Sequence, residues 1–226
     1  ASADVLVCGS GIAGIATAYF LAARHGIREV AIVDDHPPLS LTSDKSSEGY
    51  RNWWPGPGDA MIHFMNRSID LLEELAAETA NRFHLNKRGY VYLTADANRA
   101  RKMYQQAVEI TKLGAGPLRA YGNYKFSASE RYDSLLQGAD LVRDPDVIHS
   151  SFPFLASDTQ AMLHARRCGW LSAQQLGMYF LEQARAAGVR LISGRVTGVA
   201  LHSNCVQSVQ IQTGGVQKSI ATNTFV

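Results

Sequence analysis

The residues with the clearest chemical meaning are three glycines near the start of the chain, spaced Gly9-x-Gly11-x-x-Gly14. They follow the apolar run Val5–Cys8, which is typical of a buried parallel strand, and they precede a segment with helical periodicity. A turn between a strand and a helix directs backbone N–H groups and the helix dipole at one point. Gly9 permits the tight turn, Gly11 leaves room for a phosphate, and Gly14 allows close helix packing. The residues expected to bind a pyrophosphate are Gly9, Ser10, Gly11, Ile12, Ala13 and Gly14.

An acidic residue completes the pattern. Asp34 follows Gly14 by 20 residues and ends a second apolar run, Val30–Val33. At that position a carboxylate can accept hydrogen bonds from the ribose hydroxyls of a dinucleotide. Asp35 is an alternative for this role, while Asp34 itself could be a helix cap or an acid in a loop. The glycine-rich turn, too, could lack a ligand. Its position directly after the apolar run favours Asp34, and the combination favours a dinucleotide site.

These motifs require a strand–helix–strand unit, and the hydrophobic pattern predicts one, with a helix over residues 12–25 that ends at Gly26. Residues 35–59 form a long connection without helical or alternating periodicity, and residues 114–158 give only a weak signal. The other expected elements are helices over 60–81, 98–113 and 172–187, and strands over 89–94, 161–165, 189–192, 196–201, 206–212 and near 224–226.

Composition limits the class of protein. The chain has 226 residues, 46% of them hydrophobic, and a net charge of +2 from 22 basic and 20 acidic residues. This balance provides no broad electrostatic surface for nucleic acid or an anionic membrane, so we expect neither partner. No stretch resembles a transmembrane or signal segment. Cys8, Cys168 and Cys205 lack the spacing of a disulfide framework or zinc site, which favours a reducing, cytoplasmic location and no metal.

The ADP moiety is common to FAD and NAD, so the rest of the chain must distinguish them. An NAD-binding domain would continue with alternating strands and helices after Asp34, and this chain does not. The sequence resembles the D-amino-acid-oxidase-like flavoproteins, which include sarcosine, glycine and dimethylglycine oxidases. The segments that carry the resemblance are residues 5–14, 42–54, 167–171, 188–189 and 195–199.

The resemblance implies an α/β fold. A Rossmann-like FAD-binding domain with a parallel sheet (residues 1–86 and 166–226) is interleaved with part of an α+β substrate-binding domain (residues 87–165). It also implies that the loop after the second strand runs along the FAD phosphates and ribityl chain. The hydroxyls there would come from Thr42, Ser43, Ser46 and Ser47. Val196 resembles the residue whose backbone meets the adenine, with a simple core valine as the alternative.

Arg51 resembles the family's arginine that binds a substrate carboxylate. A planar guanidinium suits that task because it matches a carboxylate at two points. The alternative is a surface arginine in a solvated loop. Asp44 and Glu48 stand where a relative has a histidine and an arginine, so the substrate could differ, and covalent attachment of FAD through this loop is not expected.

The resulting hypothesis is an FAD-dependent enzyme that oxidises a C–N bond of a small amine or amino acid, such as sarcosine, by hydride transfer to the flavin. This chemistry needs orientation and an unprotonated amine, so no histidine is assigned as a general base. The family pattern continues beyond Val226, so a second chain or segment is expected to complete the fold. The alternatives are an NAD-dependent dehydrogenase and a non-catalytic dinucleotide-binding module or subunit.

Overall fold

The structure is a computed structural model that describes residues 1–45, 48–120, 124, 126 and 131–226. The chain divides into two compact units. Unit 1 contains Ala1–Ser46 and Ala173–Val226, whereas unit 2 is the continuous segment Ser47–Ser172. These limits differ from those of the expected domains because residues 47–86 and 166–172 pack within unit 2. The assignment of cofactor and substrate to the two domains stays a prediction.

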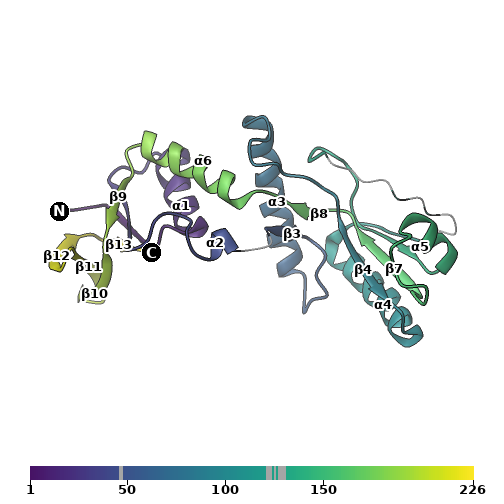
Figure 1. The fold of residues 1–226 in the computed structure, drawn as a ribbon. Helices are drawn as coiled ribbons and strands as arrows, with labels where there is room; N and C mark the ends of the chain where they lie inside the picture. The colour runs from purple at the N-terminus through teal and green to yellow at the C-terminus, as the bar shows by residue number, and fades with distance from the viewer. Residues whose placement is uncertain (46–47, 121–123, 125, 127–130) are drawn as a thin grey trace. The chain divides into compact units, whose positions relative to one another are not determined.

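Unit 1 contains a parallel sheet with the strand order β13-β1-β2-β9. Figure 1 labels two of its strands, β9 and β13. Its strands are β1 (Val5–Cys8), β2 (Val30–Asp34), β9 (Arg190–Ser193) and β13 (Thr224–Phe225). β1 and β2 are almost wholly buried, which explains why both read as continuous apolar runs. The predicted parallel sheet and the Rossmann-like fold class are confirmed.

The helices of unit 1 pack against one another and against this sheet. α1 (Ile12–Tyr19) continues into a π-helical turn, η1 (Phe20–Arg24), and both contact α6 (Ala173–Ala186). Tyr19 stacks on Phe180 with ring centroids 4.6 Å apart. The predicted stop at Gly26 is present, with φ at +67°. An antiparallel sheet of β10 (Arg195–His202), β11 (Cys205–Thr213) and β12 (Val216–Ala221) completes the unit.

Unit 2 is built on a four-stranded sheet with the order β4-β7-β6-β5. The strands are β4 (Tyr90–Thr94), β5 (Leu118–Ala120), β6 (Ala139–Val142) and β7 (Ala161–Ala165). Two short strands, β3 (Gly49–Arg51) and β8 (Cys168–Trp170), form a separate antiparallel ladder. In the chain, β3 precedes the strands of the larger sheet and β8 follows them. The helices are α3 (Ala60–Glu78), α4 (Ala97–Ile110) with its wide last turn η2 (Thr111–Ala115), and α5 (Pro145–Ser151).

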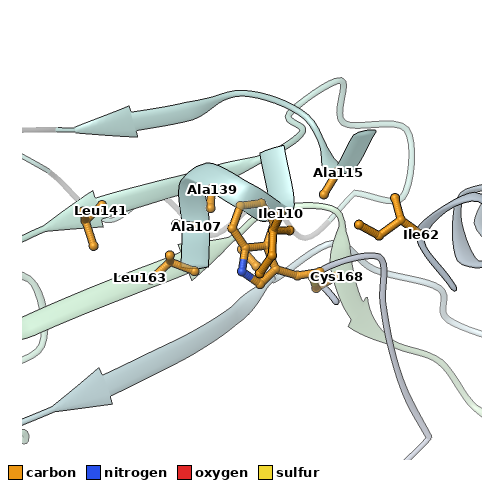
Figure 2. Packing of buried hydrophobic residues seen from close by; sticks show 10 residues of the cluster. Ile62, Ala107, Ile110, Ala115, Ala139, Leu141, Leu163 and Cys168 are labelled. Atoms are coloured by element: carbon orange, nitrogen blue, oxygen red, sulfur yellow. The ribbon is translucent and has the colours of Figure 1, made fainter. Parts of the chain in front are cut away.

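The core of unit 2 lies between α4 and its sheet. Figure 2 shows Ala107 and Ile110 of α4 close to Leu141 and Leu163 of the strands. Ile62 of α3 belongs to the same buried cluster. Burial of such side chains contributes about 25 cal/mol per Å² of apolar surface. This packing fixes α4 against the strand that carries one wall of the cavity described below.

The structure differs from the sequence expectations in two places. Residues 35–59 contain a short helix, α2 (Thr42–Lys45), and strand β3. Both are too short to produce a periodic pattern, and both depend on partners far along the chain. The helix expected to reach residue 81 ends at Glu78, because Ala80 and Asn81 adopt positive φ values of 51° and 55°. None of the helices in the described part of the chain is long and apolar enough to cross a membrane.

A buried polar network crosses the sheet of unit 2 at His164, which is 1% exposed. Its Nε2 lies 2.9 Å from the carbonyl oxygen of Arg88, so Nε2 carries the proton. Nδ1 is 2.8 Å from the Tyr124 hydroxyl and 2.6 Å from Arg166 Nη1. Burial lowers the pKa of His164; the hydrogen bond to Arg88 opposes this shift and the charge of Arg166 adds to it. The imidazole is therefore held neutral.

This lowered pKa predicts a loss of stability in acid. Unfolded, the histidine has an ordinary pKa near about 6.5, so below that pH the unfolded chain takes up a proton more readily than the folded one. The free energy of unfolding should therefore fall as pH drops from 6.5 toward the folded pKa, by up to about 1.4 kcal/mol per pH unit. Denaturant unfolding at several pH values should show a shallower dependence in His164→Gln than in the exposed control His202→Gln. Equal slopes would contradict the buried neutral histidine.

Candidate dinucleotide and substrate sites

The turn between β1 and α1 is shaped by two of its glycines. Gly9 has φ at +106°, a conformation that favours glycine. A Cβ placed on Gly14 would lie 2.0 Å from the Gly9 carbonyl oxygen and 3.3 Å from Val7 Cγ1. Only a glycine at position 14 lets α1 approach the strand this closely. The start of the helix therefore lies directly over the end of β1.

Gly11 has a different environment. An added Cβ there would meet only the Ser43 hydroxyl oxygen within 4 Å, at 3.6 Å. The absent side chain is therefore not required by internal packing and leaves open space at the first turn of α1. Ser43, buried in α2, accepts a hydrogen bond of 3.0 Å from the Ile12 N–H. Space, backbone donors and a hydroxyl meet at one point, which is the arrangement that a phosphate requires.

Asp34 connects this turn to the end of β2. The Ser10 N–H donates to Asp34 Oδ2 at 2.6 Å, and the Ser10 hydroxyl donates to the same oxygen at 3.0 Å. The His36 N–H donates to Oδ1 at 2.9 Å. Partial burial tends to raise the pKa of Asp34, but these hydrogen bonds outweigh it and lower the pKa. A carboxylate has about four acceptor positions, so three protein donors leave Asp34 ionised and able to accept another.

Asp35 is held differently, and the difference bears on the choice between the two acids. The Arg195 Nε donates to Asp35 Oδ2 at 2.6 Å, and this bond is the main reason that the Asp35 pKa is lowered. His36 Nδ1 lies 2.7 Å from Asp35 Oδ1. Asp34 thus contacts the glycine-rich turn, whereas Asp35 pairs with a side chain of β10. This arrangement favours Asp34 for the ribose role.

A cavity of about 320 Å³ opens beyond the carboxyl ends of β2 and β9. Ligands of open parallel sheets bind in this region. Asp34 and Ser10 form its polar side, and Leu191 and Ile192 of β9 form an apolar side. The remaining lining residues are Ile32, Asp35, His36, Pro37, Pro38 and Ser193. The combination of apolar walls and a free carboxylate position fits the adenosine part of a dinucleotide.

The other predicted cofactor residues lie in several environments. Thr42 is exposed at the start of α2. Val196 is half-buried on β10, packs against the core cluster that contains Leu6 and Ala31, and is not among the lining residues of this cavity. Ser46 and Ser47 lie outside the described residues. The roles of all four stay predictions.

The sequence did not reveal two parts of this cavity, His36 and the wall formed by Leu191 and Ile192 of β9. His36 contributes a backbone donor to Asp34 and a ring nitrogen to Asp35. Its only sequence signal was its place beside the two acids. Leu191 and Ile192 were read as ordinary strand residues, because nothing local shows that they pair with Ile32 and Val33 of β2, far earlier in the chain.

Arg51 lies in unit 2, where it ends β3 and pairs with Cys168 of β8. The carbon of its guanidinium is 4.1 Å from the centre of the Trp54 ring and 5.8 Å from that of Tyr90. Trp54 is itself held by a hydrogen bond of 3.0 Å from Nε1 to the Arg51 carbonyl oxygen. The stacking restrains the guanidinium at the wall of a second cavity, of about 970 Å³.

These observations agree with comparisons to known proteins. Residues 4–226 match the model of the DAO family, which is described as FAD-dependent oxidoreductases, so the chain belongs to this family. FAD is the cofactor of the family, which confirms the prediction of FAD, and the alternative of an NAD-dependent dehydrogenase does not fit. The open space at Gly11, the Asp34 carboxylate and the adjoining cavity suit the ADP part of FAD.

Individual relatives support the same family. The chain is 26% identical over 207 residues to sarcosine oxidase subunit beta from Rhodobacter capsulatus, covering 87% of this chain and 45% of the relative. Its fold is similar to L-proline dehydrogenase from P. horikoshii (TM-score 0.76, 19% identity, 99% of this chain and 52% of the other). It is also similar to glycine oxidase from Bacillus cereus (TM-score 0.75, 16% identity, 99% and 56%). The chain spans about half the length of these relatives.

Substitutions at Gly14 and Gly11 should affect different properties: the first should lower stability, and the second should remove the cofactor. Gly14→Ala places a methyl group against a backbone carbonyl and should lower the free energy of unfolding by about 1–3 kcal/mol. Gly11→Leu should leave the thermal midpoint nearly unchanged but remove bound FAD, because its side chain fills the open space. Thermal denaturation and flavin absorbance of the purified full-length protein measure the two effects. Unchanged FAD content in Gly11→Leu would exclude this turn as the phosphate site.

Proposed function

We propose that the full-length protein oxidises a C–N bond of an amino acid or a secondary amine, using FAD. The observation that carries this proposal is the restrained guanidinium of Arg51 at the wall of a large cavity. Among the described residues no carboxylate forms an ion pair with Arg51, so the guanidinium can pair with an anionic ligand. The relatives named above are a sarcosine oxidase subunit, a glycine oxidase and an L-proline dehydrogenase, whose named amino acids each carry a carboxylate.

The protein residues in this proposal bind and orient the substrate. Arg51 holds the carboxylate by two parallel hydrogen bonds, and the Trp54 ring keeps the guanidinium from rotating. The indole rings of Trp53 and Trp54, together with Leu163, exclude water from one wall. When bound, FAD supplies the acceptor for the hydride that leaves the amine-bearing carbon. Orientation of an unprotonated amine is then the main task of the protein, and no general base is assigned.

The proposal extends to the rest of the protein. We infer that a further segment or a second chain completes the site, because this chain covers only about half of its relatives. Cys8, Cys168 and Cys205 are free thiols, which supports a reducing, cytoplasmic location. Burial raises the pKa of Cys168 to about 12, so this thiol stays protonated in the core of unit 2. It is therefore a packing residue and not a nucleophile.

Loss of the Arg51 charge should weaken only carboxylate substrates. A hydrogen bond to a charged group contributes about 1.5–3 kcal/mol, so Arg51→Gln should raise KM for sarcosine by about 10–100-fold while sparing FAD content. A neutral secondary amine should be oxidised equally well by both proteins. Arg67→Gln, which removes an exposed arginine of α3, is the matched control. An equal loss with the neutral amine would exclude the carboxylate role.

The stacking of Arg51 on Trp54 can be tested separately. Trp54→Leu removes the aromatic face and the Nε1 donor. The lost attraction is about 0.5–1 kcal/mol, and the Arg51 guanidinium is also less restrained, so KM for sarcosine should rise by about 2–10-fold. Trp54→Phe should retain part of the effect because a ring remains. Steady-state kinetics with sarcosine and a neutral amine measure it. If Trp54→Leu lowers kcat for both substrates without changing KM, Trp54 does not position Arg51.

A further inference from the structure

The charged residues known to line the large cavity in unit 2 are all positively charged. Three of its lining residues are cations, Arg51, Arg99 and Lys102, and no aspartate or glutamate of the described part of the chain lines it. Its volume of about 970 Å³ is at the upper end of the range for small-molecule sites. A single carboxylate on Arg51 would leave two cations and much of this volume without a ligand group. The cavity therefore fits a ligand with more than one anionic group.

The other two cations, Arg99 and Lys102, lie on α4. Arg99 and Lys102 are one helical turn apart on α4, so both lie on the face that carries Met103 and Gln106 toward the cavity. Asp96, the N-cap of α4, accepts the Arg99 N–H at 2.7 Å. This bond, with the charges of Arg99 and Lys102, lowers the pKa of Asp96, but Asp96 does not line the cavity.

Apolar side chains line this cavity alongside the three cations. Val91 and Leu93 of β4 and Met103 of α4 line the cavity along with the tryptophans. An apolar surface together with cations suits a ligand whose anionic groups are joined by methylene groups. Sarcosine, whose apolar atoms are one methyl and one methylene carbon, would cover little of this surface.

We propose that the substrate bound by Arg51 carries a second anionic group, held by Arg99 and Lys102. The substrate class is an N-substituted or cyclic amino acid with an additional carboxylate or phosphate at the end of an apolar spacer. This inference rests on the proposed function of Arg51. It assigns α4 the role of selecting between monoanionic and dianionic amino acids.

Binding of simple acids to the full-length holoprotein tests the proposal without turnover. Calorimetric titrations should compare butyrate with the dicarboxylates succinate, glutarate and adipate, and with 3-phosphonopropionate. At least one dianion should bind about tenfold more tightly than butyrate, and the gain should shrink at high ionic strength. The carboxylate and phosphonate probes show which anion the site prefers. Dianions that bind no better than butyrate would overturn the inference.

Variants of α4 test whether Arg99 and Lys102 cause the tighter binding of dianions. The double variant Arg99→Gln with Lys102→Gln should lose the tenfold gain and keep the affinity for butyrate. Arg101→Gln removes a cation from the same helix that does not line the cavity, so it should keep the gain. All changed residues are exposed, and circular dichroism melting shows whether the variants fold. A gain that survives in the double variant would overturn the assignment to Arg99 and Lys102.

Turnover separates this inference from the proposed function. Oxidation of N-methyl-L-glutamate should have a KM about tenfold below that of sarcosine in the unaltered protein and equal to it in the double variant. If sarcosine is oxidised but dianions gain nothing, the proposed function stands and the inference fails. If dianions bind tightly but no amine is oxidised, the proposed function fails, and with it the assignment of this cavity to a substrate.

Discussion

The close approach of α1 to β1 at Gly14 is the constraint on which the cofactor end of the molecule depends. Because the Gly9 carbonyl oxygen occupies the position that a Cβ on Gly14 would need, the helix can begin directly over the strand. Only from there does the Ser10 N–H reach Asp34 at the end of the neighbouring strand. One missing methyl group thus determines where the helix dipole points and how the turn meets the Asp34 carboxylate, the group predicted to bind the ribose.

The two candidate sites use different physical means. Near β1 and β2 the donors to Asp34 are two backbone N–H groups and the Ser10 hydroxyl, and Asp35 pairs with Arg195. Backbone donors of this kind suit a cofactor that stays the same across a family. Around Arg51 the polar groups are long cationic side chains, one of them restrained by an aromatic ring. Side chains can change without disturbing the fold, so specificity can diverge there while the cofactor end stays the same.

The sequence predicted the parts whose signals are local. β1, α1, β2 and the glycine-rich turn were found because buried parallel strands read as apolar runs and the turn has fixed spacing. α2, β3, β8 and β12 were not found, since each is short or polar and depends on tertiary partners, such as Gly49 with Trp170 or Ser43 with the Ile12 N–H. The choice between Asp34 and Asp35 also needed coordinates, because adjacent side chains point in different directions. Nothing local distinguishes the cations of α4 from those of an ordinary exposed helix face.

The interruption of unit 1 by the whole of unit 2 has a consequence for biosynthesis. During translation β1 and β2 leave the ribosome before β9, which pairs with β2 and follows all of Ser47–Ser172. Unit 2 is continuous, so its core can close while the first two strands still have an open edge. Such an edge is a template for wrong pairing. The nascent chain therefore passes through a stage at which the edge of β2 that later pairs with β9 is open.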